Sequence, residues 1–304
     1  MWNILNGEKI AVLLPKQFNA ESMYSFIQRA VDDQGDAQCK EITFDFSKLE
    51  FIEPVAVVVL SNLIEYFSKL GVKTRFAGHQ TLTKPVIYLD DSGFFKQYLG
   101  ATLRAHAALR DTTLPLQLVA NPQAIGYLYE QMIPWIAIQL RTTAIALATV
   151  RVCLQEVFHN ISDHSGVNVG CVFAQHFPKT GELQVAVSDF GFGIPSNVRK
   201  LKPNATDSQA LVLALQEGFT TKSNVQNRGA GLPLLMKYVT LKNRGAVLIT
   251  SGKANISAVF EGQTTKITAR DRPVSYPGTL VRVILKTDTL QALAQDIELE
   301  EFSW

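Results

Sequence analysis

The sequence predicts an α/β protein of two domains. The chain has 304 residues, of which 47% are hydrophobic, and this is enough apolar material for two packed cores. Patterns typical of strands and of helices alternate along residues 1–105, as in a layered α/β fold. The segment 106–113 belongs to a stretch of small and polar residues and is the expected linker. We therefore expect one domain at residues 1–105, a second at 114–287 and a tail at 288–304.

The first domain is expected to consist of short alternating elements. Asn6-Gly7 is typical of a tight hairpin turn, and Gly71 is typical of the residue that ends a helix. The expected strands are Trp2–Leu5, Lys9–Leu14, Glu41–Phe46 and Val72–Ala77, and the expected helices are Glu21–Val31, Val55–Leu70 and Phe94–Leu99.

The second domain is expected to open with a strand and two long helices. Pro134 should kink the first helix, because proline has no amide proton and its ring crowds the preceding turn. The tail from Asp288 begins as a helix and becomes acidic at residues 298–301. The expected helices are Pro122–Leu140 and Thr142–His164, and the expected strands include Leu116–Ala120, Gly245–Ser251, Ile256–Phe260 and Thr279–Leu285.

Charge and cysteine content argue against several classes of function. The formal net charge is +2, so the sequence gives no strong signal for a nucleic-acid partner. Cys39, Cys153 and Cys171 lack the spacing of a metal site and lie in apolar runs, which indicates reduced, buried thiols in a cytoplasmic protein. No signal peptide and no apolar run of membrane length is present, so no membrane association is expected.

The run VRVCLQEVFHNISDHS at residues 150–165 has two different faces. Apolar residues at helical spacing, Leu154, Val157, Phe158 and Ile161, predict a stripe that faces a core. Glu156, Asn160 and Asp163 follow one another on the opposite side. A carboxylate and a carboxamide one turn apart suit a hard, hydrated cation such as Mg²⁺, with a base nearby to act on water. The alternative is an ordinary solvated polar face.

The run LQVAVSDFGFG at residues 183–193 predicts a strand that ends in a glycine turn. Leu183, Val185 and Val187 alternate as in a half-buried strand, and Asp189 continues their inward phase. A buried carboxylate needs a partner, and Gly191 and Gly193 remove side chains, as a backbone does where it passes close to a ligand. The alternative is a simple turn in which the aspartate acts as a cap.

The run RGAGLP at residues 228–233 precedes an apolar segment that is expected to be helical. Glycines at the start of a helix leave backbone N–H groups free at its positive end, which favours binding of phosphate. Thr221 and Lys222 lie upstream and supply a hydroxyl and a cation that could meet a terminal phosphate. The alternative is a glycine loop that only caps a helix.

These three motifs, in this order, resemble those of the GHKL ATPase superfamily, which includes gyrase-type, Hsp90-type, histidine-kinase and MutL-type ATP-binding domains. The resemblance covers residues 114–286 and implies a Bergerat-type α/β sandwich, a mixed sheet covered by helices. It implies that Asn160 binds Mg²⁺, that Asp189 accepts a hydrogen bond from the adenine amino group, and that Glu156 activates water or a hydroxyl. The other implied ATP-binding residues are Asp163, Gly191, Gly193, Thr221, Lys222, Arg228, Gly229, Gly231 and Leu232. Within the superfamily, the run ALATVRVCLQEVFHNISDHS is most similar to the anti-sigma-factor serine kinases.

The segment 194–228 is expected to form the lid of this domain. It is rich in Asn, Ser, Thr and Gly and carries one helical patch at Ser208–Gln216. Long connecting segments in compact domains are commonly functional, and we expect this one to close over the phosphates.

Most of residues 1–100 resembles the STAS fold of anti-sigma-factor antagonists. The resemblance rests on the run ITFDFSKLEFIEPVAVVVLSNLIEYFSKLGVKTRFAG and on VIYLDDSGFFKQY, both largely apolar. Phosphorylatable members of that family carry a serine at the start of the helix, where this chain has Glu53-Pro54. Glu53 either imitates a permanently charged state or is simply a polar residue before a helix that starts with proline. The resemblance implies a docking or dimerisation module.

Three functions are compatible with these patterns. The first is an ATP-binding regulatory protein in which lid ordering and slow hydrolysis switch binding to a partner protein. The second is a protein serine/threonine kinase of the anti-sigma-factor type, and the third is a non-catalytic nucleotide-binding interaction module. The candidate partners are a STAS-like protein, a transcription regulator or a second copy of the chain.

Overall fold

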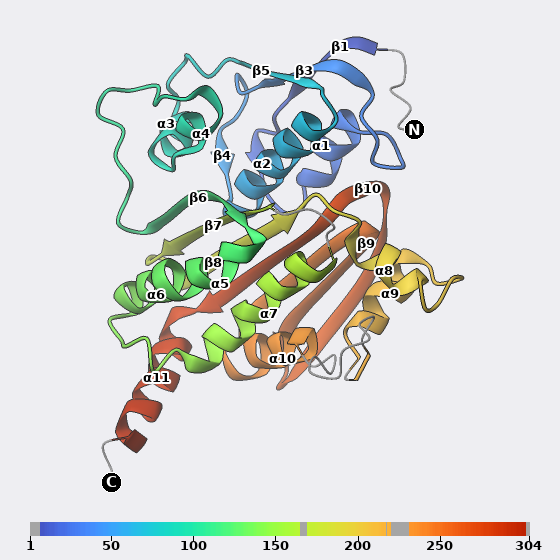
Figure 1. The fold of residues 1–304 in the computed structure, drawn as a ribbon. Coiled ribbons are helices and arrows are strands. Elements are labelled where there is room, and N and C mark those ends of the chain that lie inside the picture. The colour runs from blue at the N-terminus through green and yellow to red at the C-terminus, as the bar shows by residue number, and fades with distance from the viewer. Residues whose placement is uncertain (1–6, 165–168, 217, 220–230, 302–304) are drawn as a thin grey trace.

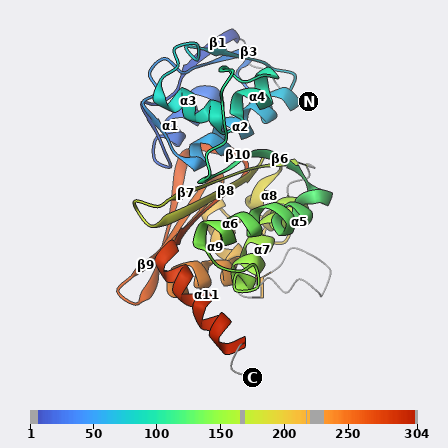
Figure 2. The ribbon, with the colours of Figure 1, turned by 90° about the vertical axis from the view of Figure 1, so that its left-hand side faces the viewer.

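The computed structural model describes residues 7–164, 169–216, 218–219 and 231–301, and these form an α/β structure of stacked sheets and helices (Figure 1). A three-stranded sheet, a layer of helices, a five-stranded sheet and a second layer of helices follow one another (Figures 1 and 2). No helix within the described ranges is both long enough and apolar enough to span a bilayer. The stacked sheets and helices confirm the predicted α/β class.

The N-terminal region, residues 7–105, contains the predicted alternation of strands and helices. Its parallel three-stranded sheet has the order β1-β3-β5, and β2 and β4 form a separate short parallel pair. Helix α3 and the two short strands β2 and β4 were not predicted, and the hairpin expected at Trp2–Leu5 lies outside the described residues. The strands are β1 (Gly7–Leu13), β2 (Gln17–Phe18), β3 (Cys39–Asp45), β4 (Phe51–Ile52) and β5 (Lys73–Ala77), and the helices are α1 (Met23–Ala30), α2 (Pro54–Lys69), α3 (Lys84–Asp91) and α4 (Phe94–Leu99).

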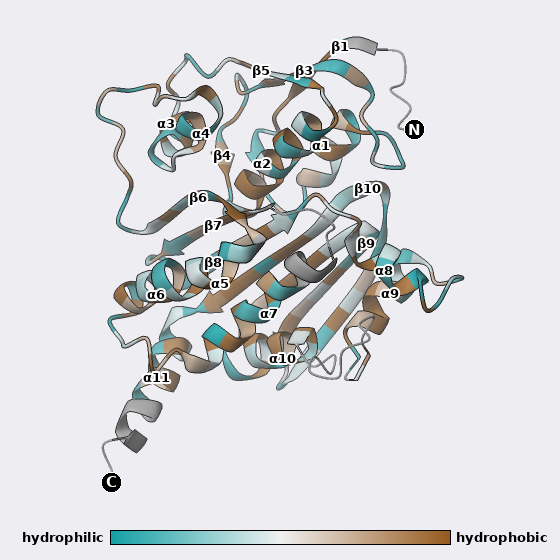
Figure 3. Ribbon diagram, in the orientation of Figure 1, coloured by the Kyte–Doolittle hydropathy of each residue, from teal (hydrophilic) through white to brown (hydrophobic). Residues whose placement is uncertain are grey.

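Helix α2 is buried on nearly all sides because it lies between the two sheets. Apolar residues occur all around it, from Val55 to Phe67, and Figure 3 shows this apolar character along the helix. A helix that is apolar all round must be covered on every face. Its far side packs on the five-stranded sheet, where the Ser61 hydroxyl donates to the Cys171 thiol at 3.3 Å. One hydrophobic cluster therefore joins the N-terminal region to Phe173 and Leu280 of that sheet.

The five-stranded sheet is antiparallel in every described strand pair, so the predicted mixed sheet was wrong for this layer. Its order is β6-β7-β8-β10-β9, and consecutive strands pair as hairpins at β7–β8 and β9–β10. Short hairpin connections can join only antiparallel strands, which explains the pairing of β7 with β8 and of β9 with β10. The strands are β6 (Thr113–Ala120), β7 (Val169–Phe177), β8 (Glu182–Asp189), β9 (Ala246–Glu261) and β10 (Thr264–Lys286).

Helices cover the other face of this sheet and enclose a second hydrophobic cluster (Figure 1). The long helix predicted over Pro122–Leu140 is interrupted by a π-helical turn (Leu128–Met132), after which Pro134 occupies the first turn of the next helix, as a proline kink requires. The predicted helix from Thr142 begins later, at Ala148. The segments are a 3₁₀ turn (Asn121–Gln123), α5 (Ala124–Tyr127), α6 (Ile133–Leu140), α7 (Ala148–His164), α8 (Gly193–Arg199), α9 (Asp207–Ala214), α10 (Gly231–Lys237), a second π-helical turn (Tyr238–Lys242) and α11 (Thr287–Glu301).

Strand β8 is buried on both faces, so the predicted half-buried pattern was wrong. Val185 and Val187 face the cluster under α7, while Ala186 and Leu280 of the neighbouring strand lie in the cluster under α2. The second face of the sheet is thus covered by the N-terminal region rather than by solvent. The residues of β8 that point to this second face include Ala186, which is small, and Ser188, which is hydrogen-bonded, so both can be buried there.

The stretch that contains the expected linker is tied to the N-terminal region by ion pairs. The Arg104 guanidinium contacts Asp90 at 3.1 Å and also Asp91, and Arg110 contacts Asp91 at 3.2 Å. Strand β6 begins at Thr113, the last residue of that expected linker. The chain therefore passes from one sheet to the other along a fixed path.

Candidate nucleotide-binding site

The side chain of Glu156 lies directly against Gly231. A methyl group built on Gly231 would come within 2.0 Å of the Glu156 Oε2 atom, so a glycine is required for this approach. Glu156 is half-buried on α7, whose other face places Leu154, Val157 and Phe158 in the core. The structure thus brings together two segments that are 75 positions apart in the chain, the polar face of α7 and the start of α10.

Asp189 lies at the end of β8 and is almost completely buried, with 1% of its surface exposed. Burial raises the pKa of its carboxyl group from 3.8 to about 7, and hydrogen bonds from the backbone of Gly191 and Thr279 act in the opposite direction. The Gly191 N–H donates to the Asp189 Oδ1 atom at 2.7 Å. The partner that a buried carboxylate requires is therefore backbone amide rather than a cationic side chain.

The turn after β8 is fixed by neighbouring strands. Gly193 has a φ of +75°, and a methyl group on it would lie 2.6 Å from the Ser251 hydroxyl oxygen. That hydroxyl accepts from the Ile194 N–H at 2.9 Å and donates to the Gly278 carbonyl at 2.8 Å. The absence of a side chain at position 193 is thus explained by packing against β9 and β10 rather than by the approach of a ligand.

Gly278 contacts the other side of the same turn. Its φ is +98°, and a methyl group on it would lie 2.1 Å from the Asp189 carbonyl oxygen and 2.8 Å from its Oδ1 atom. Ser251, Gly278 and Thr279 were missed as site residues by sequence reasoning. A Pro-Gly pair at 277–278, inside an otherwise continuous strand pattern, was the available signal, because such a pair marks a bulge or a close approach.

The remaining predicted site residues are described only in part. Asn160 and Asp163 lie on α7, but their side chains fall outside the described part of the chain, and Leu232 is buried in the core beside α7. Thr221, Lys222, Arg228 and Gly229 lie outside the described residues. Within the described ranges, no cluster of three or more His, Cys, Asp and Glu side chains has the arrangement of a metal site. The magnesium role of Asn160 therefore stays a prediction.

The described part of the lid contains two helices. The predicted patch at Ser208–Gln216 is confirmed as α9, which begins with a capping box between Thr206 and Gln209. Arg199 of α8 forms an ion pair with Asp207, whose Oδ2 atom also accepts from the Lys253 N–H at 2.6 Å. These contacts attach the start of the lid to β9.

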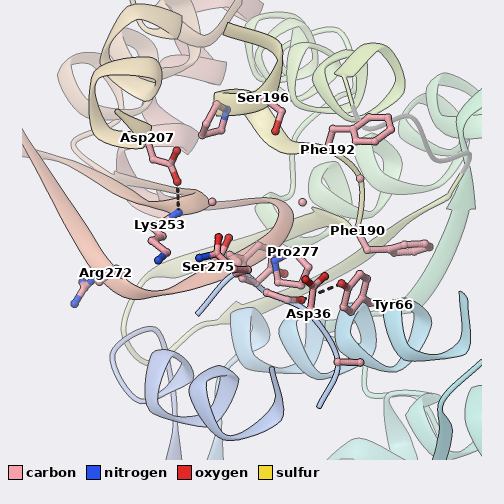
Figure 4. Close-up of a pocket in the computed structure, with 18 of the residues that line it drawn as sticks. Asp36, Tyr66, Phe190, Phe192, Ser196, Asp207, Lys253, Arg272, Ser275 and Pro277 are labelled. Atoms are coloured by element: carbon pink, nitrogen blue, oxygen red, sulfur yellow. Dashed lines mark hydrogen bonds between the residues drawn. The ribbon is translucent and has the colours of Figure 1, made fainter. Parts of the chain in front are cut away.

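A separate cavity of about 990 Å³ lies between the turn after β8 and the N-terminal region. Figure 4 shows Tyr66 and Asp36 on one side of it and Ser196 and Asp207 on the other, with Phe190 projecting from the turn. The Lys69 ammonium lies 5.8 Å from the centre of the Phe190 ring. Neither Glu156 nor Gly231 lines this cavity, so it is distinct from the contact between α7 and α10.

Comparison with known proteins gives little similarity. No protein-family model and no curated protein matches this chain. Among solved structures, the B subunit of the DNA gyrase from Myxococcus xanthus aligns with a TM-score of 0.19 and 17% identity, over 35% of this chain and 28% of that one. The N-terminal domain of a DNA repair protein aligns with a TM-score of 0.16 and 17% identity, over 38% of this chain and 30% of that one. The chain thus spans less than a third of either protein, and alignments this weak carry no argument about function.

Proposed function

We propose that this chain binds Mg²⁺-ATP in a pocket bounded by α7, the turn after β8 and the start of α10. The observation that carries the proposal is the contact of Glu156 with Gly231, because it joins the polar helix face to the glycine segment expected to hold phosphates. Helix α7 also packs against β8, the strand that ends in Asp189. Helix α7 therefore contacts both of the elements that carry the other two motifs, which supports the proposal.

Asp189 is the proposed reader of the adenine base. Its carboxyl is buried and held by backbone amides, so its acceptor atoms have a fixed direction. A hydrogen bond donated by a ligand would favour the charged form of this carboxyl and lower its pKa from about 7. An amino group on a purine is such a donor, and a site built around one acceptor rejects bases that present an oxygen instead.

Glu156 and Asn160 are proposed to act at the phosphate end of the nucleotide. Both are on α7, one turn apart, and Glu156 reaches the start of α10. A magnesium ion at Asn160 would neutralise phosphate charge when bound. Glu156 would orient a water molecule or a hydroxyl group and accept its proton.

We further propose that ATP binding acts as a switch for a partner protein, with slow hydrolysis as its reset. Support comes from the position of the lid, whose first helices attach to β9 at the edge of the sheet. A kinase acting on its own N-terminal region at the position of the STAS serine is disfavoured, because Glu53 occupies that position and pairs with Arg282 at 2.9 Å. A kinase that acts on a separate protein is the second candidate.

Calorimetric titration of the full chain with ATP and Mg²⁺ tests the proposal. We expect binding by the wild type, loss of ATP binding in Asp189→Asn, and retained binding with lost hydrolysis in Glu156→Ala. Asp271→Asn is the matched control, because it removes an exposed carboxylate that lies away from Glu156. Absence of ATP binding by the wild type contradicts the proposal. Phosphate released from ATP alone supports the switch, whereas transfer only to an added hydroxyl-bearing protein supports the kinase.

A further inference from the structure

Residues 277–278 form a bulge in β10 that lies between helix α2 and Asp189. The pairing of β10 with β9 shifts register on both sides of Tyr276 and resumes at Thr279. Residues 277 and 278 therefore leave the regular ladder, as in a bulge. One side of this bulge meets Asp189 through Gly278, and the other side meets the N-terminal region.

The side chain of Asn62 holds the bulge from the α2 side. Asn62 is fully buried, and its Nδ2 atom donates to the Pro277 carbonyl oxygen at 3.3 Å. A buried polar side chain in a largely apolar helix is costly unless it is hydrogen-bonded. Pro277 is followed directly by Gly278, whose α-carbon is pressed against Asp189. The hydrogen bond of Asn62 thus acts one residue away from the carboxylate that is proposed to read adenine.

A second buried contact fixes the same bulge from within the sheet. The Tyr276 hydroxyl lies 2.6 Å from the Ser188 hydroxyl, which donates to the Thr279 carbonyl at 2.9 Å. Ser188 directly precedes Asp189 on β8, and both tyrosine and serine are buried. The bulge is therefore held at its two ends, and Asp189 has no room to move toward it.

We propose that Asn62 is a positioning residue for Asp189, so that the N-terminal region sets the base selectivity of the nucleotide site. The proposal rests on the proposed ATP-binding function and adds to it. It assigns the N-terminal region a part in forming the pocket, beyond docking of a partner. In this proposal, the hydrogen bond from Asn62 fixes the Pro277 carbonyl and thereby the adjacent Gly278. Gly278 packs against Asp189 and so fixes the position of its carboxylate.

Inosine triphosphate is the probe that separates positioning from general stability. Its base carries an oxygen where ATP carries the 6-amino group, and a proton on the neighbouring N1, so the ratio of ATP affinity to inosine triphosphate affinity reports on recognition of the base edge that Asp189 is proposed to contact. In Asn62→Leu, which keeps the branched shape of the side chain and removes the donor, we expect ATP binding to weaken about tenfold while inosine triphosphate binding is unchanged, because a displaced charged hydrogen bond loses about this much.

Tyr66→Phe is the matched control. Tyr66 lies one turn further along α2, is also buried, and donates to the Gly35 carbonyl at 2.9 Å, inside the N-terminal region. Loss of the Tyr66 hydroxyl should lower the melting temperature and leave the ratio of ATP affinity to inosine triphosphate affinity unchanged. If Asn62→Leu does not fold, Tyr276→Phe tests the same bulge, because it keeps the ring and removes only the hydroxyl contact with Ser188.

The outcomes separate this inference from the proposed function. If the wild type binds neither nucleotide, both the proposed function and the inference fail. If the wild type prefers ATP and the bulge variant keeps the same ratio, the inference alone is overturned. A reduced ratio in the bulge variant with an unchanged ratio in Tyr66→Phe supports it, whereas an equal reduction in both variants shows a structural effect of α2 and overturns it.

Discussion

The carboxylate of Glu53 and the guanidinium of Arg282 form an ion pair between the start of α2 and the five-stranded sheet, with Oε2 and Nη2 2.9 Å apart. Glu53 immediately precedes α2, and Arg282 lies on β10. The contact is an ion pair without hydrogen-bond geometry, since the Oε2 atom has no hydrogen-bond partner among the described residues. The Arg282 guanidinium also donates to the Gln184 side chain at 3.0 Å. Glu53 thus holds the N-terminal region to the five-stranded sheet.

Replacing Glu53 should weaken this junction. The side chains of Glu53 and Arg282 are 24% and 13% exposed, so Glu53→Gln leaves a largely buried cation without its counter-charge. We expect the free energy of unfolding to fall by about 1–2 kcal/mol, below the cost of breaking a fully buried pair. Urea denaturation of Glu53→Gln, Arg282→Met and the double variant measures the coupling. Glu50→Gln, which breaks an exposed pair with Lys16, should change little, and additive single effects would show that the Glu53 pair contributes nothing.

Gly231→Ala should disturb the site without disturbing the fold. The three atoms nearest to the added methyl group all belong to the Glu156 side chain, which would be displaced from the position proposed for the base. We expect unchanged melting and a loss of at least about tenfold in ATP turnover, in the range of general-base contributions. Gly126→Ala is the control, because a methyl group there meets nothing within 4 Å. If Gly231→Ala lowers turnover further in an Glu156→Ala background, the effect does not pass through Glu156.

The buried carboxyl of Asp189 should make the protein less stable as the pH rises. Its pKa is 3.8 in an exposed state and about 7 in the folded protein, so between these values the folded protein holds a proton that the unfolded chain has lost. The cost is absent below pH 3.8, grows up to pH 7 and is complete above it. Asp189→Asn should therefore stabilise the nucleotide-free protein, by about 3 kcal/mol more at pH 8 than at pH 5. Denaturant unfolding at both pH values measures this, and a pH-independent difference would contradict the assigned pKa.

Cys171 should report on the junction between α2 and the five-stranded sheet. Burial raises its pKa to about 12, and the thiol accepts a hydrogen bond from Ser61 of α2. Thiolates react and thiols do not, so a disulfide reagent should label Cys171 only when α2 leaves the sheet. In a Cys39→Ala, Cys153→Ala background, we expect labelling at the rate of global unfolding. Faster labelling, unaffected by denaturant, would show that α2 undocks while the rest stays folded.

The parts of the fold that could be predicted depend on local patterns. The apolar stripe of α7 and the valines of β8 are visible within a few residues, and both elements occur where they were predicted. Asp189 was correctly placed inside, because a strand has a period of two residues. The approach of Glu156 to Gly231 was predicted only through the family resemblance, since no local pattern relates these positions.

What could not be predicted depends on contacts between distant segments. A fully apolar helix such as α2 indicates complete burial but does not say which surface covers it. The burial of both faces of β8 follows from the packing of α2 on the sheet. The antiparallel pairing of β7 with β8 and of β9 with β10 follows from their hairpins. Ser251 and Gly278 belong to the candidate site because a methyl group on Gly193 or on Gly278 would lie within 3 Å of Ser251 or Asp189, and such close packing appears in a sequence only as a serine and a glycine.

Because α2 lies between two sheets, neither half of this molecule is a finished surface on its own. A truncated chain that starts after residue 105 would present Phe173, Ala186 and Leu280 to water as one contiguous apolar area, which promotes aggregation. The N-terminal half alone would expose the opposite side of the same helix. The two halves should therefore be expressed, degraded and exchanged between proteins only as one unit.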